Sequence, residues 1–402
     1  MEDIFEKELA KETVFLDRNV LSPHYLPDEL PFREKEIEKI MKTLAPALKG
    51  KRFNNLFIYG KTGTGKTAST KHVIEKLLNV KEKYDAKVDA VYINCRITKT
   101  KYQVLMKCVE HFYPEETLLG YPFQHLVDKL IKAVETKQLN LVIVLDELDK
   151  VKDLDDLIYT LTRTNDEIST GHVGFIGITN DVGFKTKLDP RSKSTLCEEE
   201  MVFAPYNAEQ LKEILKQRAE KGFKKGAVEE AALSYAAALA AQESGDARYA
   251  LKLLLKAGEV ADHEEAKKIT EAHVRKARKE VEEEIVYELI NTLPEHEKIL
   301  LYGIALLSKE AGKYARLDGT YEDRMLYTGE VYERYERLCH ELGKDPRTAR
   351  WCKEYLGELE MLGLITTTLS GKGVRGNTTL IRLSFPAERI KKIIEKTLIG
   401  KE

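Results

Sequence analysis

The sequence predicts an α/β fold in which a parallel sheet carries a glycine-rich loop and is followed by a helical lid and a C-terminal winged helix. Three observations support this prediction. The loop Gly60–Thr67 lies between an apolar run and a helix-forming segment. Short apolar runs then alternate with helical segments as far as about residue 204, which is typical of parallel sheets. Near the C-terminus, three helical segments precede two short strands joined by a glycine-rich stretch, which is the winged-helix pattern.

Changes in composition divide the 402 residues into four segments. We expect an N-terminal arm and helix, an α/β core, a helical lid and a winged-helix domain, at 1–53, 54–204, 205–284 and 285–402. Three prolines between Asp17 and Pro31 predict an extended path, because proline fixes φ and removes a backbone donor. From Arg33 onward, apolar residues recur at helical spacing and predict a helix.

Composition and charge exclude several classes of protein. The formal net charge of −2 gives no overall attraction to nucleic acid or to an anionic membrane, so any such binding depends on local patches. No apolar run reaches the ~20 residues of a membrane span, and the N-terminus lacks a signal-peptide pattern. We therefore expect a soluble, cytoplasmic protein with no membrane partner. The cysteines lack metal-binding spacing and are expected to be reduced core thiols: Cys95, Cys108, Cys197, Cys339 and Cys352.

The loop Gly60–Thr67 matches the phosphate-binding pattern G-x-x-x-x-G-K-[ST] in its confirming context of strand, turn and helix. Its glycines let backbone N–H groups approach phosphates, and the following helix N-terminus favours negative charge. We expect Lys66 to bind the β- and γ-phosphates and the Thr67 hydroxyl to bind Mg²⁺. The predicted cofactors are therefore ATP or ADP with Mg²⁺. The residues expected to bind them here are Gly60, Lys61, Thr62, Gly63, Thr64, Gly65, Lys66, Thr67 and Ala68.

A second motif follows the third strand of the predicted sheet. The strands are expected at Leu56–Tyr59, Val88–Asn94, Leu141–Leu145, Val173–Thr179 and Met201–Phe203. The third ends in Asp146 and Glu147, at the edge where ligands bind open α/β sheets. We expect Asp146 to hold Mg²⁺ and Glu147 to orient and deprotonate the attacking water. Asn180, after the fourth strand, either shares that water and senses the γ-phosphate or ends the strand as a turn residue.

Three arginines far from the loop in sequence are candidates for phosphate contact. Arg191, in the stretch Leu188–Ser194, suits an arginine finger offered to a neighbouring subunit, or else pairs with nearby acids on the surface. Arg163 is a weaker second candidate for the same role. Arg248 opens a lid helix, where its charge opposes the helix dipole, so a phosphate contact explains it better than a structural role.

The last segment carries basic residues at the two places where winged helices contact DNA. Asp345 and Pro346 predict the start of its third helix, whose first turns would enter a groove. The glycine-rich stretch between the two strands would reach the minor groove or the phosphates. The residues expected to contact DNA are Arg347, Arg350, Lys353, Lys372 and Arg375. Docking of a protein on the winged helix is the alternative.

Seven segments, distributed nearly from end to end, carry a family resemblance: Leu21–Pro27, Leu30–Glu34, Asn55–Thr67, Leu188–Arg191, Phe203–Tyr206, Gly245–Arg248 and Glu358–Ile365. Through them the chain resembles the AAA+ ATPases, and among these the archaeal DNA replication initiators of the Orc/Cdc type. The resemblance implies an AAA+ P-loop sheet with a helical lid and a C-terminal winged helix. It makes Asn180 the first sensor, Arg191 the finger and Arg248 the second sensor, and it places Tyr206 and Arg218 where the family contacts ATP from the lid.

The resemblance also implies contacts in two further places. The segment from about 112 to 130 matches the position of a helix with which these initiators touch DNA, although Glu115 and Glu116 make it acidic here. Phe32 stands in the arm where the family usually has His, in a segment that is placed either to cover the nucleotide base or simply to pack on the core.

The function implied by the resemblance is that of an ATPase which binds double-stranded origin DNA in its ATP-bound form and helps recruit the replicative helicase. Other initiator copies are further expected partners. Hydrolysis would be slow and would act as a switch, because the finger Arg191 must come from a neighbouring subunit. One alternative is a winged-helix AAA+ motor helicase, which would form hexamers with DNA-stimulated ATPase activity. The other is an ATP-gated signalling switch whose winged helix binds protein.

Overall fold

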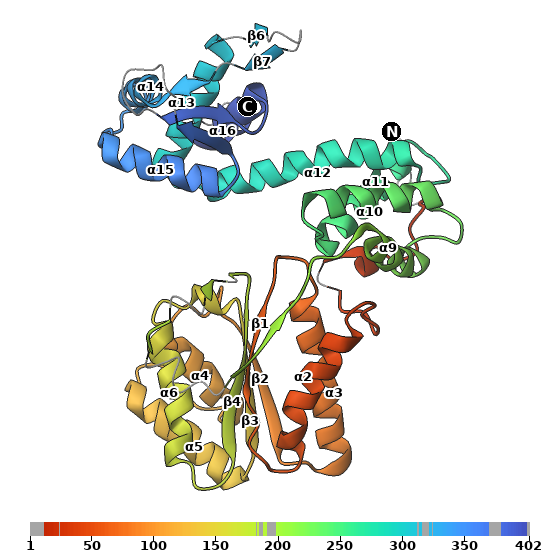
Figure 1. Cartoon of the computed structure of the whole chain (residues 1–402), viewed down its shortest axis with the longest axis vertical. Helices are drawn as coiled ribbons and strands as arrows, with labels where there is room; N and C mark the ends of the chain where they lie inside the picture. The colour runs from red at the N-terminus through yellow and green to blue at the C-terminus, as the bar shows by residue number, and fades with distance from the viewer. Residues whose placement is uncertain are drawn as a thin grey trace, which may run out of the picture. The chain divides into compact units, whose positions relative to one another are not determined.

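The computed structural model describes residues 12–23, 25–181, 183–184, 188–190, 198–311, 313–315, 321–323, 325–369 and 379–399 (Figure 1). They belong to two compact units, which divide between Ala277 and Arg278. The first unit contains the arm, the α/β core and the lid, and the second contains the winged helix. The finer predicted boundaries at 53, 204 and 284 stay predictions.

The core of the first unit is a sheet of five parallel strands in the order β2-β3-β4-β1-β5. All five predicted strands are present, at β1 (Asn55–Tyr59), β2 (Val88–Asn94), β3 (Asn140–Asp146), β4 (His172–Thr179) and β5 (Glu198–Val202). The interior strand β3 is buried along its whole length, because helices cover both faces of the sheet. The register pairs Asp146 with Ile178 and with Asn94, so the carboxyl ends of β2, β3 and β4 lie at one edge.

Side chains alternate between the two faces of the sheet and fill two separate hydrophobic clusters. In β1, Phe57 packs with α4 (Lys101–Phe112), α5 (Phe123–Lys137) and α6 (Leu154–Glu167). Its neighbours Leu56 and Ile58 pack on the other face with α2 (Glu34–Leu48) and α3 (Lys66–Tyr84). Figure 1 shows these two helical layers on either side of the strands. The α/β core is therefore a three-layer structure, as predicted.

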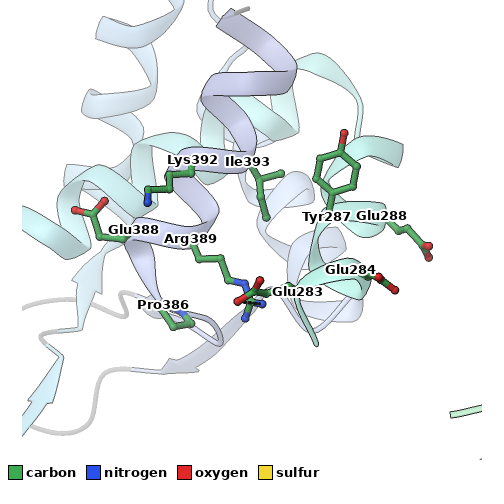
Figure 2. Close-up of a pocket in the computed structure, with 9 residues that line it drawn as sticks. All are labelled: Glu283, Glu284, Tyr287, Glu288, Pro386, Glu388, Arg389, Lys392 and Ile393. Atoms are coloured by element: carbon green, nitrogen blue, oxygen red, sulfur yellow. Dashed lines mark ion pairs between the residues drawn. The ribbon is translucent and has the colours of Figure 1, made fainter. Parts of the chain in front are cut away.

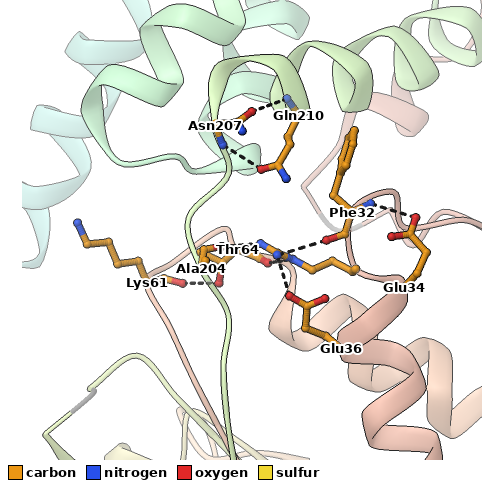
Figure 3. A network of polar contacts seen from close by, with 9 residues as sticks. Phe32, Glu34, Glu36, Lys61, Thr64, Ala204, Asn207 and Gln210 are labelled. Atoms are coloured by element: carbon orange, nitrogen blue, oxygen red, sulfur yellow. Dashed lines mark hydrogen bonds and ion pairs between the residues drawn. The ribbon is translucent and has the colours of Figure 1, made fainter.

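The lid consists of α9 (Ala208–Gly222), α10 (Glu230–Glu243), α11 (Ala247–His263) and the first residues of α12 (Glu271–Thr292). Asn207 begins α9 with a capping box, in which its side chain and that of Gln210 each accept a backbone N–H of the other residue (Figure 3). Asp246 caps α11 by accepting the backbone N–H of Arg248 at 2.7 Å. This cap fixes the start of the helix on which Arg248 lies.

The arm departs from the extended path predicted for Asp17–Pro31, because it contains a short 3₁₀ helix, η1 (Arg18–Leu21). Asp17 starts this turn by accepting the backbone N–H of Asn19 at 2.9 Å. Val20 and Leu21 are buried, and Leu21 lies against Gly222 of α9. Burial of these apolar side chains therefore overrides the extended tendency of the proline-rich sequence.

The second unit has the predicted winged-helix helices α13 (Glu295–Ala311), α14 (Thr328–Glu341) and α15 (Ala349–Met361), and the predicted strands β9 (Ile365–Leu369) and β10 (Thr379–Leu383). A short strand, β8 (Leu326–Tyr327), pairs with β10 and makes the sheet three-stranded in the described residues. A hairpin of β6 (Lys313–Ala315) and β7 (Tyr321–Asp323), the helix α16 (Ala387–Ile394) and the π-helical η3 (Glu395–Ile399) were not predicted.

The predicted start of α15 at Pro346 is wrong, since the helix begins at Ala349 with Thr348 as its N-cap residue. Two tyrosines of α14 hold the preceding stretch. The Tyr335 hydroxyl accepts the backbone N–H of Arg347 at 3.1 Å, and the Tyr332 hydroxyl donates to the Arg347 carbonyl at 3.3 Å. These contacts keep Arg347 in the connection before the helix rather than in its first turn.

Three expectations from composition can be compared with the described residues. Four cysteines, Cys95, Cys108, Cys339 and Cys352, are buried and form no disulfide, while Cys197 lies outside the described residues. No helix in the described part of the chain is both long and apolar enough to cross a membrane. Among the described residues, no group of three or more His, Cys, Asp or Glu side chains is arranged to hold a metal ion.

Candidate nucleotide site and nucleic-acid interface

The phosphate-binding loop forms the tight turn that its glycines predict. Gly63 and Gly65 adopt φ values of 66° and 89°, in the left-handed region that glycine tolerates best. The side chain of Lys66 lies along the loop and is 6% exposed. Its Nζ donates to the carbonyls of Gly60 at 2.7 Å and Lys61 at 2.6 Å, and to Asn180 Oδ1 at 2.9 Å. The loop, the start of α3 and the end of β4 therefore meet at one ammonium group.

Other positively charged side chains lie close to this ammonium group. The pKa of Lys66 is lowered to about 8, chiefly by burial and also by the nearby charges of Arg248 and Arg33, against the opposite effect of Asp146 and Asp246. Three cations thus converge beside a loop of backbone amides. The negative charge of a polyphosphate would balance these cations, so these residues fit the nucleotide that the loop predicts.

The predicted metal ligands are in contact. The Thr67 hydroxyl donates to Asp146 Oδ2 at 2.9 Å, and Asp146 is 6% exposed. Tyr92 of β2 donates its hydroxyl to the same oxygen, and burial together with this bond raises the pKa of Tyr92. A hydroxyl and a carboxylate held together in this way are the donors that P-loop proteins offer to Mg²⁺. The sequence reasoning missed Tyr92, because its side chain meets Asp146 only through the pairing of β2 with β3.

Glu147 and Asn180 lie beside these groups. Glu147 has a left-handed backbone with φ of 55°, and its N–H donates to Asp146 Oδ1 at 3.0 Å. Left-handed geometry in a glutamate is costly and is found most often at functional sites. Thr179 binds Asp149 at 2.8 Å through its hydroxyl, which ties the end of β4 to the turn after β3. Of the two interpretations of Asn180, its contact with Lys66 favours the sensor role over that of a simple turn residue.

The lid contacts the phosphate-binding loop directly. The backbone N–H of Ala247, at the start of α11, donates to the Gly63 carbonyl at 3.1 Å. A Cβ placed on Gly63 would overlap the Asp246 carboxylate, and one placed on Gly65 would come within 2.8 Å of the Tyr206 hydroxyl. Tyr206 and Arg248 therefore lie close to the loop, as the predicted nucleotide contacts require.

Other predicted arginines have different partners in this structure. Arg218 is 6% exposed and donates to the carbonyls of Val20 at 3.0 Å and Tyr25 at 3.2 Å, so it holds the arm. Its predicted contact with nucleotide stays a prediction. Arg163 pairs with Asp166 at 2.7 Å on the surface of α6. The finger Arg191 lies outside the described residues.

Three residues predicted to contact DNA lie in the connection before α15 and in its first turns. Arg347, Arg350 and Lys353 are exposed, and the Arg350 side chain is 89% exposed with Glu354 at 3.8 Å. Trp351 lies among them and is 51% exposed. Lys372 and Arg375 lie outside the described residues. Three cations and Trp351 are thus exposed in the connection before α15 and in its first turns, which suits a groove of DNA, while Glu354, Glu358 and Glu360 are exposed further along the helix.

Two further features bear on where ligands bind. The segment from about 112 to 130 contains the connection between α4 and α5 and the beginning of α5, and Leu119 in the connection is 79% exposed. Its predicted contact with DNA stays a prediction. In the second unit, a groove of about 710 Å³ lies between α12 and α16 (Figure 2). It has acidic and basic walls, including Glu283 and Arg389, which pair at 2.9 Å, and it contains none of the predicted site residues.

Three family models match the chain in the order of its parts. An AAA domain model matches residues 51–179, a Cdc6 AAA+ ATPase-type lid domain model matches 212–279, and a CDC6 C-terminal winged helix domain model matches 288–393. Together with the geometry of the site, they define an AAA+ ATPase with a Cdc6-type lid and a winged helix.

Curated relatives narrow this class. The ORC1-type DNA replication protein of Thermococcus onnurineus is 43% identical over 399 residues, which cover 98% of this chain and 94% of the relative. The ORC1-type DNA replication protein 1 of Methanosarcina mazei is 40% identical over 395 residues, with 98% and 93% covered. The chain belongs to the family of ORC1-type DNA replication proteins. The solved structure of the Aeropyrum pernix ORC1 protein in complex with DNA is also similar, with 37% identity, a TM-score of 0.82, and 96% of this chain and 98% of that chain covered.

Proposed function

We propose that this protein is a replication initiator that binds double-stranded origin DNA in its ATP-bound state and helps recruit the replicative helicase. The observation that carries the proposal is the meeting of Lys66, Thr67, Asp146 and Asn180 at one sheet edge, in a chain of the ORC1-type family. We place the protein in the cytoplasm, at the nucleoid. Other copies of the initiator are its proposed partners.

The residues at the sheet edge have distinct tasks in this proposal. Bound Mg-ATP supplies the γ-phosphoryl group that is transferred to water. Lys66 exchanges its bonds to the Gly60 and Lys61 carbonyls for phosphate oxygens, a change that restores the ordinary pKa of its ammonium group. Thr67 and Asp146 hold the metal ion, and Glu147 accepts a proton from the attacking water.

Hydrolysis is proposed to be slow and to act as a switch. Asn180 bonds Lys66 here, and it orients water and reports the γ-phosphate when Lys66 moves to the phosphates. Arg248 reaches the phosphates from the lid, and Arg191 is supplied by a neighbouring copy. A monomer lacks that arginine in its own site, so its turnover is limited by assembly.

DNA binding is proposed to use the exposed first turns of α15 and the connection before it. Arg347, Arg350 and Lys353 contact phosphates or base edges in the major groove, and Lys372 and Arg375 contact the minor groove or the phosphates. Because the whole chain carries a net charge of −2, these local cations supply the attraction to DNA.

The proposal is tested by measuring binding to DNA from replication start regions and to shuffled DNA at near-physiological salt, with and without Mg-ATP. We expect ATP-dependent preference for the origin DNA, its loss in Lys66→Ala, and slow turnover by the monomer. Hexamers with DNA-stimulated turnover would replace the proposal with a motor helicase. Absence of DNA binding at any salt concentration would replace it with a signalling switch.

A further inference from the structure

Arg33 lies between the arm and α2, and its side chain is 4% exposed. Its Nε donates to the Thr64 carbonyl at 2.9 Å, and a terminal nitrogen donates to the Ala204 carbonyl at 2.6 Å. Another terminal nitrogen pairs with Glu36 at 3.1 Å. Figure 3 shows this network around Thr64, Ala204 and Glu36. One guanidinium group thus joins the phosphate-binding loop to the linker that leads from β5 into the lid.

The bond to Thr64 fixes the orientation of one peptide group in the loop. In a planar trans peptide, the carbonyl oxygen and the following N–H point in opposite directions. Because Arg33 holds the Thr64 carbonyl on its own side, the N–H of Gly65 points away from Arg33. Gly65 is one of the residues whose N–H groups the loop offers to phosphate, and its φ of 89° depends on this peptide orientation.

The same guanidinium group also lies over two aromatic rings of the linker. Its central carbon lies 4.0 Å from the centroid of the Tyr206 ring and 5.3 Å from that of Phe203. The Tyr206 hydroxyl in turn lies against Gly65, where a Cβ would come within 2.8 Å of it. Displacement of the Thr64–Gly65 peptide therefore moves both the arginine and the tyrosine that begins the lid.

A role in fold stability alone would explain why Arg33 is buried. It would not explain why Arg33 bonds mainly to backbone carbonyls. Arg33 has one carboxylate partner, Glu36, which leaves most of its donors to backbone carbonyls. Its charge lowers the pKa of Lys66, so the two cations are close enough to repel each other. That repulsion is relieved when an anion occupies the loop.

We infer that Arg33 is a positioning residue that holds the Thr64–Gly65 peptide ready for phosphate and transmits nucleotide occupancy to the lid through Ala204 and Tyr206. The inference rests on the proposed nucleotide binding and adds a role that the phosphate-binding motif does not contain.

The test compares wild type with Arg33→Ala, Arg33→Lys and the control Lys35→Ala, which removes an exposed cation two residues away. Release of a fluorescent ATP analogue with Mg²⁺ is timed, and hydrogen exchange in residues 203–215 is measured with and without nucleotide. We expect about tenfold faster release from Arg33→Ala and loss of the nucleotide-induced protection in the linker. Arg33→Lys keeps the charge but not the two-pronged geometry, and we expect intermediate release with reduced protection. Lys35→Ala should behave as wild type.

The outcomes separate this inference from the proposed function. Wild-type release rates and unchanged linker protection in both Arg33 variants would overturn the inference alone, while Lys66→Ala still lost nucleotide. Failure of wild type itself to bind nucleotide would overturn the proposed function and the inference with it. If Arg33→Ala does not fold, as judged by circular dichroism, the folded Arg33→Lys variant decides by the same two measurements.

Discussion

The ammonium group of Lys66 lies among backbone carbonyls and two arginines, and its lowered pKa of about 8 makes its charge sensitive to mildly alkaline pH. Phosphate oxygens favour the charged form, so nucleotide binding raises this pKa again. Binding then takes up a proton wherever the free protein has lost it, that is, above pH 8.

We predict that ATP affinity is nearly independent of pH between 6.5 and 8 and falls above pH 8, by at most about tenfold per pH unit. The direction follows because the free site releases its proton first and must regain it on binding. Titration calorimetry in two buffers of different ionisation enthalpy measures the proton uptake directly. An affinity that stays constant to pH 9.5 would contradict the assigned environment of Lys66.

Tyr92 and Asp146 form the second site contact that can be tested by one substitution. Tyr92→Phe removes the hydroxyl that orients Asp146 beside Thr67, while the ring keeps its place. We predict that half-maximal ATP binding then needs about tenfold more Mg²⁺, since a hydrogen bond to a charged group contributes about 1.5 kcal/mol. Binding without Mg²⁺ should not change. Tyr84→Phe, at an exposed position on α3, is the matched control.

Sequence analysis identified the residues whose spacing matches a known motif. It missed residues whose contacts are with residues far away in the sequence. Lys66, Thr67 and Asp146 belong to known patterns, and they lie together at the sheet edge. Tyr92 belongs to no such pattern, and Arg33 belongs only to the stretch Leu30–Glu34 of the family resemblance, which gave it no role. Their partners are a loop carbonyl and a carboxylate that only folding brings close to them.

At the scale of elements, segments with strong hydrophobic periodicity were predicted correctly, whereas short elements were missed or misplaced. Four core strands lie where their apolar runs predicted them, because helices cover them on both faces. The edge strand β5 begins at Glu198, before the predicted Met201, and its Val202 is 64% exposed. The strand β8 has two residues and pairs only in the folded sheet. The start of α15 was misplaced because contacts with Tyr332 and Tyr335 outweigh the local initiation signals of Asp345 and Pro346.

The exposed face of α15 gives a prediction for DNA binding. Arg350→Ala should weaken binding about three- to tenfold at fixed salt and, if Arg350 contacts a phosphate, reduce the slope of log affinity against log salt by about one. Arg337→Ala is the matched control, because it removes an exposed arginine of α14 with a similar acidic neighbour, Glu333 at 3.8 Å. Equal losses in both variants would indicate a diffuse charge effect and not an interface at α15.

The inner face of α15 gives a prediction for stability. Leu359 is fully buried in the core of the winged-helix unit. Leu359→Ala should lower the free energy of unfolding of that unit by about 2–5 kcal/mol, because it leaves a cavity. Calorimetry should show the loss in one transition only, and ATP affinity should remain that of wild type. A parallel loss of ATP binding would show that the two units do not behave independently.

At the scale of the whole molecule, the chain combines a nucleotide unit, which includes the arm and lid, with a winged-helix unit. The sequence could predict both parts, because each has its own periodicity and motifs. Family membership is shown by relatives that match 98% of the chain. The central claim of the proposed function is that ATP bound to the first unit controls DNA binding by the second. This property belongs to neither unit alone.

Genome-wide crosslinking of the tagged protein to DNA in its source organism, with the Lys66→Ala variant alongside, tests this claim most directly. We predict sharp peaks at replication start sites for the wild type, and weaker or absent peaks for the variant at equal protein levels. Diffuse or absent wild-type signal would contradict the role in initiation, and identical sharp peaks in the variant would contradict the dependence of DNA binding on ATP.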